Sequence, residues 1–185
     1  MPGHIARGAE WSIAFSNPQY IREIVENGRC ARGVERLGFS PLAFAMRGTN
    51  CEAPTETTEG IARFILNCKE IAITEAGTSG AQFHRLLEAL GIADEMRGRV
   101  RLMPGGGPMA ALKGGDVDVA ALPLTNIAPV EGVTARVFCP RALDVHIDLM
   151  FCLRAGVHPG AERLALWIRD AERRVTLEKL GLRPI

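Results

Sequence analysis

The sequence lacks the features that define several large classes of protein. Its 22 Lys and Arg residues nearly balance its 21 Asp and Glu residues, so there is no basic excess for binding a nucleic-acid backbone. No apolar run approaches the roughly 20 residues that a membrane-spanning helix needs. A composition with 47% hydrophobic and 23% charged residues excludes disorder, collagen and coiled coil. The 185 residues therefore predict one domain, or two small lobes within it.

Paired cysteines and metal-ligand clusters are also missing. None of the cysteines forms a C-x-x-C pair or groups with the four histidines, so we expect no metal site and no cofactor. An odd number of thiols fits poorly with an oxidising compartment, and we expect most of them to be buried in a reduced protein. Residues 1–10 contain no apolar core of a signal peptide. The five cysteines are Cys30, Cys51, Cys68, Cys139 and Cys152.

What is present is an alternation of short apolar runs with amphipathic segments. Strands are predicted at residues 11–15, 41–46, 70–74, 99–103, 117–122, 134–138 and 146–153. Helices are predicted from Pro18 to about 27, at 59–68, from about Ser79 to Gly91, at 109–113, and over 160–180 with a break near Asp170. This order predicts an α/β fold with mostly parallel sheets flanked by helices. Ligands of such sheets bind where strands lead into helices.

Three predicted helix starts carry capping residues. Asn17 precedes a proline at the first helical position, and Thr57 or Thr58 precedes the helix at 59–68. Ser79 with Gln82 matches a capping box.

The segment Gly77-Thr78-Ser79-Gly80 is suited to holding an anion. It follows a buried strand and opens a helix, whose first N–H groups are unpaired and carry about half a positive charge. Hydroxyl groups there can donate to an oxyanion, and glycine lets the ligand approach the backbone. The alternative is that Ser79 only caps its helix.

A second turn of the same kind is Gly105-Gly106-Gly107-Pro108, which exposes backbone N–H groups between a strand and a helix. It matches neither a Walker motif nor G-x-G-x-x-G, and a glycine run is also compatible with a flexible turn. Thr125 and Asn126 follow a third strand and offer hydrogen bonds, or are ordinary turn residues.

Catalytic patterns are sparse, and we assign no catalytic residue. Gly77-Thr78-Ser79-Gly80 is too short for G-x-S-x-G, and His84 is best interpreted as a solvated histidine on a helix. The guanidinium groups of Arg47, Arg136 and Arg141 are candidates for pairing with a carboxylate ligand, although arginine is also the commonest surface cation here.

These segments resemble the type 2 periplasmic binding proteins, in the branch of molybdate-binding and related ABC-transporter solute receptors. The resemblance rests on three stretches of sequence. They are Gly77-Thr78-Ser79-Gly80 with the helix to Asp94, Met103-Pro104-Gly105-Gly106-Gly107-Pro108 with Gly115-Asp116-Val117-Asp118-Val119, and the C-terminal Leu177 to Ile185.

The resemblance implies two lobes, the first formed by residues 1–75 and 128–185 and the second by residues 76–127. It implies a small oxyanion or carboxylate held between them by N–H and hydroxyl groups. The implied ligand-binding residues are Thr78, Ser79, Gly80, Gly106, Gly107, Thr125 and Asn126. It further implies a periplasmic location and an ABC-transporter permease as a partner.

Relative to the family, we expect the chain to lack the signal peptide, the opening strand and the first helix. A cytoplasmic location is therefore an alternative. An incomplete first lobe would expose unpaired strand edges, through which a second copy or partner chain could complete it. Two other functions stay open: an enzyme resembling aconitate isomerase, with His84 or Glu75 as the base, and a cytoplasmic effector-sensing module.

Overall fold

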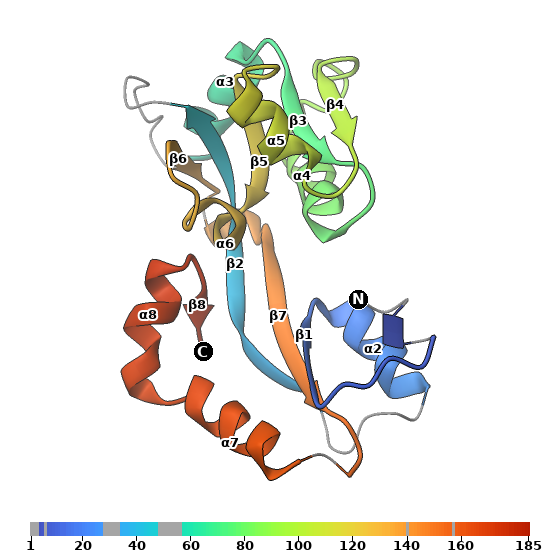
Figure 1. The fold of residues 1–185 in the computed structure, drawn as a ribbon. Helices are drawn as coiled ribbons and strands as arrows, with labels where there is room; N and C mark the ends of the chain where they lie inside the picture. The colour runs from blue at the N-terminus through green and yellow to red at the C-terminus, as the bar shows by residue number, and fades with distance from the viewer. Residues whose placement is uncertain (1–3, 6, 28–33, 48–56, 140, 157) are drawn as a thin grey trace. The chain divides into compact units, whose positions relative to one another are not determined.

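A computed structural model describes residues 4–5, 7–27, 34–47, 57–139, 141–156 and 158–185 (Figure 1). Contacts divide the chain into two compact units. Unit 1 comprises Met1–Phe39 and Asp148–Ile185, and unit 2 comprises Ser40–Ile147. These boundaries differ from the lobes implied by the resemblance, because residues 40–75 and 128–147 group with the second unit.

Unit 1 is built from antiparallel strand pairs and helices. β1 pairs with β7, and the first part of β2 pairs with β8. Its elements are β1 (Ile13–Ser16), α2 (Pro18–Glu26), part of β2 (Glu35–Arg47), part of β7 (His146–Leu153), α7 (Pro159–Ile168), a 3-10 turn (Ala171–Arg173), α8 (Arg174–Lys179) and β8 (Arg183–Pro184).

The predicted start of α2 is confirmed, with Asn17 as N-cap and Pro18 in the first turn. Its mechanism differs from simple capping, because the Asn17 side chain donates to the carbonyl oxygen of Asp148 at 3.0 Å and makes no cap bond. The predicted break near Asp170 is also confirmed, since α7 ends at Ile168 and the Asp170 carboxylate accepts a hydrogen bond from the Glu172 amide.

Unit 2 contains a parallel sheet with the order β5-β3-β4, extended by antiparallel pairs of β2 with β5 and β6. Its elements, besides the remaining parts of β2 and β7, are α3 (Thr58–Asn67), β3 (Ile71–Thr74), α4 (Thr78–Ala89), β4 (Val100–Met103), α5 (Gly107–Gly114), β5 (Val119–Pro123), α6 (Leu124–Ile127), β6 (Val133–Phe138) and a 3-10 turn (Arg141–Leu143). The α/β class is confirmed, although the parallel pairs described are only those of β3.

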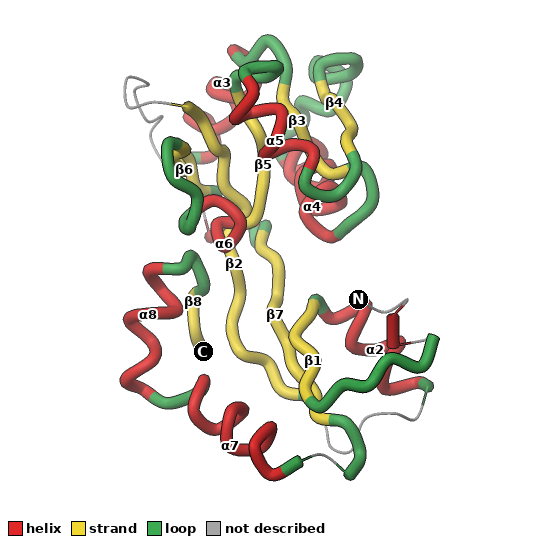
Figure 2. The backbone as a smooth tube through the Cα atoms, in the orientation of Figure 1, coloured by secondary structure: helices red, strands yellow, loops and turns green. Residues whose placement is uncertain are grey.

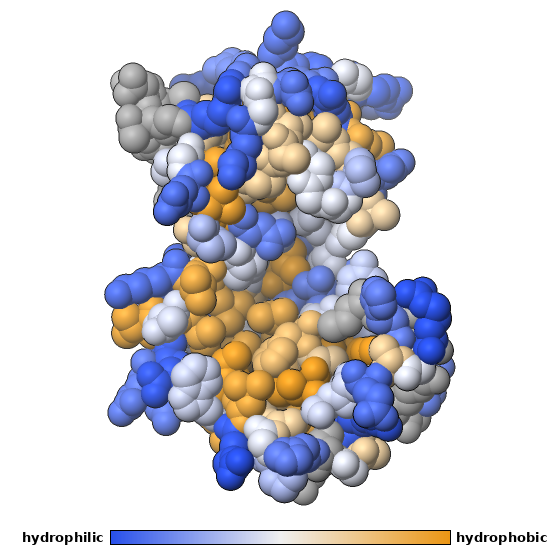
Figure 3. Space-filling view, viewed as in Figure 1, coloured by the Kyte–Doolittle hydropathy of each residue, from blue (hydrophilic) through white to orange (hydrophobic). Residues whose placement is uncertain are grey.

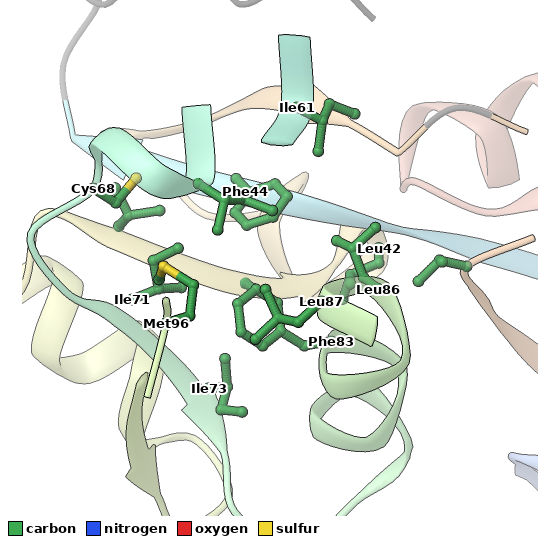
Figure 4. Packing of buried hydrophobic residues seen from close by; sticks show 14 of the residues in the cluster. Leu42, Phe44, Ile61, Cys68, Ile71, Ile73, Phe83, Leu86, Leu87 and Met96 are labelled. Carbon is green, nitrogen blue, oxygen red and sulfur yellow. The ribbon is translucent and has the colours of Figure 1, made fainter. Parts of the chain in front are cut away.

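Two hydrophobic clusters cover the two faces of the unit 2 sheet, because strand side chains alternate between faces. Leu42, Phe44, Ile71 and Ile73 contribute to a cluster of large side chains with α3 and α4 (Figure 4). The intervening alanines of β2, β3 and β5 form the second cluster with α5 and α6. A sheet covered on both faces directs its chemistry to the strand ends.

β2 and α3 both begin earlier in the chain than predicted. β2 spans Glu35–Arg47, whereas the apolar run predicted only 41–46. Thr57 caps α3 by accepting a hydrogen bond from the Gly60 amide at 3.1 Å.

Among the described residues, every helix is too short or too polar to cross a membrane.

Candidate functional site

The turns singled out in the sequence lie at one edge of the unit 2 sheet. β3 runs parallel to both β4 and β5, so the turns that follow these three strands start from the same edge (Figure 2). The Glu75 amide donates to the carbonyl oxygen of Met103 at 2.8 Å, which joins the ends of β3 and β4 directly. The turns at residues 77–80 and 105–107 therefore both begin at the carboxyl ends of adjacent strands.

The first turn depends on two glycines. Gly77 has φ +151°, a conformation that a residue with a Cβ rarely adopts, and it precedes the first residue of α4. A Cβ at Gly80 would lie 2.0 Å from the carbonyl oxygen of Thr74, so only glycine lets α4 start this close to the end of β3. The sequence segment is thus shaped to place a helix N-terminus against a strand end.

Three donors of this turn have no partner among the described residues. The first backbone bond of α4 runs from Ala81 to the Gly77 carbonyl at 3.2 Å, which leaves the amides of Ser79 and Gly80 outside the helical ladder. Ser79 is only 9% exposed, and no described residue forms a hydrogen bond with its hydroxyl group. Thr78, beside it, is half-buried.

The predicted capping box is wrong. α4 begins at Thr78 with Gly77 as its N-cap, so Ser79 already lies inside the first turn and caps nothing. Gln82 does not reach back to a cap either, because its Oε1 atom is buried without a hydrogen-bond partner in the described structure. The S-x-x-Q spacing was correct, but the conformation of Gly77 moves the helix start ahead of it.

The glycine-rich turn after β4 provides fewer free donors than expected. Gly106 has φ +83° and is the N-cap of α5, and its carbonyl accepts from Ala110 at 3.2 Å. The Gly107 amide donates to the Pro104 carbonyl at 2.9 Å, so it is already used within the turn. Gly105 and Gly106 are exposed, and their amides have no partner among the described residues.

The turn after β5 is a short helix, α6, rather than an open loop. The Thr125 amide donates to the Ser40 hydroxyl at 3.0 Å, and Ser40 is 3% exposed. Thr125 is half-buried and Asn126 is exposed, and Thr125 retains only its side chain to offer hydrogen bonds here. Ser40 was missed in the sequence; a lone hydroxyl inside an otherwise apolar strand was the available signal.

No basic residue occurs in residues 74–80 or 103–110, and Glu75 is the only charged residue in these two stretches. A negatively charged ligand would therefore meet amide and hydroxyl dipoles there. Arg47 lies elsewhere, 3.6 Å from Asp118 near the start of β5, and packs against Gly115. The side chains of Arg136 and Arg141 lie outside the described residues.

Among the described residues of unit 2, no other reactive side chains assemble into a metal-binding group. His84 is exposed, as expected. Within the described part of the chain, no group of His, Cys, Asp and Glu residues has a metal-binding arrangement. Cys68, Cys139 and, in unit 1, Cys152 form no disulfide in the described part of the chain. Burial raises the pKa of Cys139 to about 12. Cys30 and Cys51 lie outside the described residues.

Comparisons with known proteins agree on one family and one fold. Residues 2–183 match the family model of bacterial extracellular solute-binding proteins. Comparison with curated proteins found no match.

Three similar solved structures cover nearly the whole chain. A substrate-binding domain assigned to a molybdenum ABC transporter of Clostridium difficile has a TM-score of 0.75 and 13% identity, over 100% of this chain and 81% of that one. The periplasmic molybdate-binding protein of Azotobacter vinelandii has a TM-score of 0.73 and 16% identity, over 98% and 81%. PEB3 of Campylobacter jejuni with bound L-phospholactate has a TM-score of 0.72 and 11% identity, over 99% and 84%. At these identities the likeness establishes the fold alone.

Proposed function

The chain belongs to the bacterial extracellular solute-binding proteins, and we propose that its solute is a small oxyanion or carboxylate held at the edge of unit 2 where β3 and β4 end. The observation that carries this proposal is the pair of glycine-shaped helix starts joined by the bond between Glu75 and Met103. Helix N-termini with unpaired amides favour negatively charged groups.

The proposed donors divide into two groups. From the first turn come the amides of Ser79 and Gly80 together with the hydroxyl groups of Thr78 and Ser79. From the second comes the amide of Gly106, with Gly107 shaping the turn rather than donating. Thr125 contributes its side chain only, because its amide is bonded to Ser40, and Asn126 contributes its side chain.

The chemistry of the ligand follows from the absence of basic residues in these two turns. An oxyanion or carboxylate with several acceptor oxygens can receive many neutral donors, and charge-assisted hydrogen bonds of this type are stronger than neutral ones. The similar structures named for molybdate and L-phospholactate support this class of ligand. We further propose an extracytoplasmic location and delivery of the solute to an ABC-transporter permease, since one similar structure is named for an ABC transporter and another for the periplasm.

The test is calorimetric titration of the protein with molybdate, tungstate, sulfate, phosphate and citrate at physiological ionic strength. We expect at least one of these anions to bind with one site per chain. Ser79→Ala removes a hydroxyl that has no internal partner, so it should leave folding unchanged and weaken binding by about fivefold to tenfold. Ser12→Ala, at an exposed serine of unit 1, is the matched control. If no anion binds and none raises the melting temperature, the proposal is wrong.

A further inference from the structure

β4 is an edge strand with backbone groups left unpaired. Among the described residues it pairs only with β3. The Ile71 amide donates to Arg99 and the Glu75 amide to Met103, so residues 99, 101 and 103 turn their backbone groups toward β3. By the same alternation, Val100 and Leu102 direct their N–H and C=O groups to the other side. No described residue accepts or donates a bond there.

A pocket of about 260 Å³ lies beside this edge. The side chains of Val100 and Leu102 line it, together with Leu87 and Met96, which are almost completely buried. Leu102 is 51% exposed and is the only exposed large hydrophobic side chain among the described residues of unit 2. The residues with unpaired backbone groups thus also border an apolar depression. The pocket shares no residue with the turns at 77–80 and 105–107.

We propose that the open side of β4 binds an extended peptide segment of a partner protein, which pairs with β4 as a further strand. Val100 and Leu102 offer donors and acceptors one dipeptide apart, about 6.6 Å, which is the repeat of an extended chain. A strand added there places alternate side chains on the face of the pocket, as in other cases of strand addition. The partner segment therefore carries apolar residues at alternate positions.

The rim of the pocket carries charges of both signs. Glu88 and Arg97 border the pocket with opposite signs, and Arg97 also pairs with Asp94. A peptide of either charge therefore gains little from the rim, since exposed ion pairs contribute little. The apolar side chains determine the selection, and we expect binding to depend weakly on salt concentration.

The experiment follows amide hydrogen exchange in the full chain by NMR. The probes are acetyl-Lys-Thr-Leu-Thr-Leu-Thr-Lys-amide and versions in which both leucines become Val, Ile, Phe or Met. Binding should slow exchange at Val100 and Leu102 by about tenfold or more, while Arg101 and Met103, whose backbone groups face β3, change little. A peptide with serine at both positions should have no effect.

Two variants distinguish peptide binding at β4 from nonspecific binding to exposed apolar side chains. Leu102→Lys should weaken peptide binding by about tenfold, because it places a charge over the pocket. Leu166→Lys, at another exposed leucine, lies in unit 1 and should leave binding unchanged.

Three results would overturn the proposal. The first is that no peptide of the set protects Val100 and Leu102. The second is equal peptide binding by both lysine variants. The third is protection of both amides without peptide in a chain that sediments as a dimer, which would assign the edge to a second copy. None of these results depends on whether anions bind.

Discussion

Unit 2 is one continuous stretch of chain with a large core, whereas unit 1 is assembled from two segments with small ones. The main cluster of unit 2 contains completely buried side chains of β2, β3, α3 and α4, and a second cluster covers the other face of its sheet. The clusters of unit 1 have five and four buried members. Donors intended for a ligand are best held by rigid packing, and the turns proposed for the anion lie in the better-packed unit.

The surfaces of the two units also differ, because unit 1 exposes more large hydrophobic side chains than unit 2 does. On the face shown in Figure 3, hydrophobic side chains gather over α8 and the strands of unit 1. Unit 2 contributes only Leu102 to the exposed large hydrophobics of the described chain. The others, all in unit 1, are Val25, Leu164, Leu166, Trp167, Val175, Leu180 and Ile185. Unit 1 therefore leaves more of its large hydrophobic side chains exposed than unit 2 does.

The largest expected difference is independent folding. Because unit 2 is contiguous, a fragment of residues 40–147 should fold alone and unfold cooperatively in urea. A matched polypeptide joining residues 1–39 to 148–185 through a Gly-Ser linker should show a weaker transition or none. Circular dichroism during urea titration measures both. Equal midpoints for the two polypeptides would contradict the difference between the units.

The next largest expected difference is the loss of unfolding free energy when a buried phenylalanine of each unit is replaced by alanine. Phe83 in unit 2 contacts the ring of Phe44 at a centroid distance of 6.1 Å and is completely buried. Phe83→Ala should lower the free energy of unfolding by about 3–5 kcal/mol. Phe151→Ala in unit 1 should cost less, because its cluster is small and its neighbours Phe15 and Leu149 are half-buried. Urea denaturation of both variants checks this, and a larger loss for Phe151→Ala would reverse the ranking.

Within unit 2, two glycines test how strictly the proposed site is shaped. Gly80→Ala places a Cβ against the Thr74 carbonyl, so we expect a loss of about 1–3 kcal/mol in stability and at least tenfold weaker anion binding. Gly105→Ala meets no atom within 4 Å and should change stability by less than about 0.5 kcal/mol. Thermal melts and titrations give both values. Intact anion binding by a folded Gly80→Ala protein would remove α4 from the site.

The smallest expected effect concerns a thiol. Burial raises the pKa of Cys139 to about 12 from its ordinary value of 9.0. The unfolded chain loses this proton at lower pH than the folded chain, so stability is unaffected below pH 9 and falls as the pH rises from 9 toward 12. At neutral pH the thiol should alkylate slowly in the native protein and quickly in urea. Mass spectrometry of the Cys139 peptide measures both rates, and Cys139→Ala should flatten this pH dependence.

Much of the local structure was predictable from short stretches of sequence. The Asn17-Pro18 helix start, the Thr57 cap and the break near Asp170 each depend on a few adjacent residues. The two glycine turns were also recognisable, because glycine after a strand indicates a backbone conformation that other residues avoid. The resemblance in the middle motifs likewise led to the family that the family model confirms.

Other features of the site were not predictable, because they depend on partners distant in sequence. Ser40 accepts the Thr125 amide across 85 positions, which removes a donor that the turn alone offered. The start of α4 at Thr78 follows from its fit against Thr74, not from the S-x-x-Q spacing.

The order of residues alone determined where the chain turns and which side chains are apolar, since φ preferences and two-residue alternation act within a few residues. Tertiary structure decided the length of β2, the boundary between the units at residues 39–40 and 147–148, and the position of Val100 and Leu102 in an edge strand. The physical reason is that a backbone amide can be satisfied by many partners, and only the assembled sheet selects which one it has.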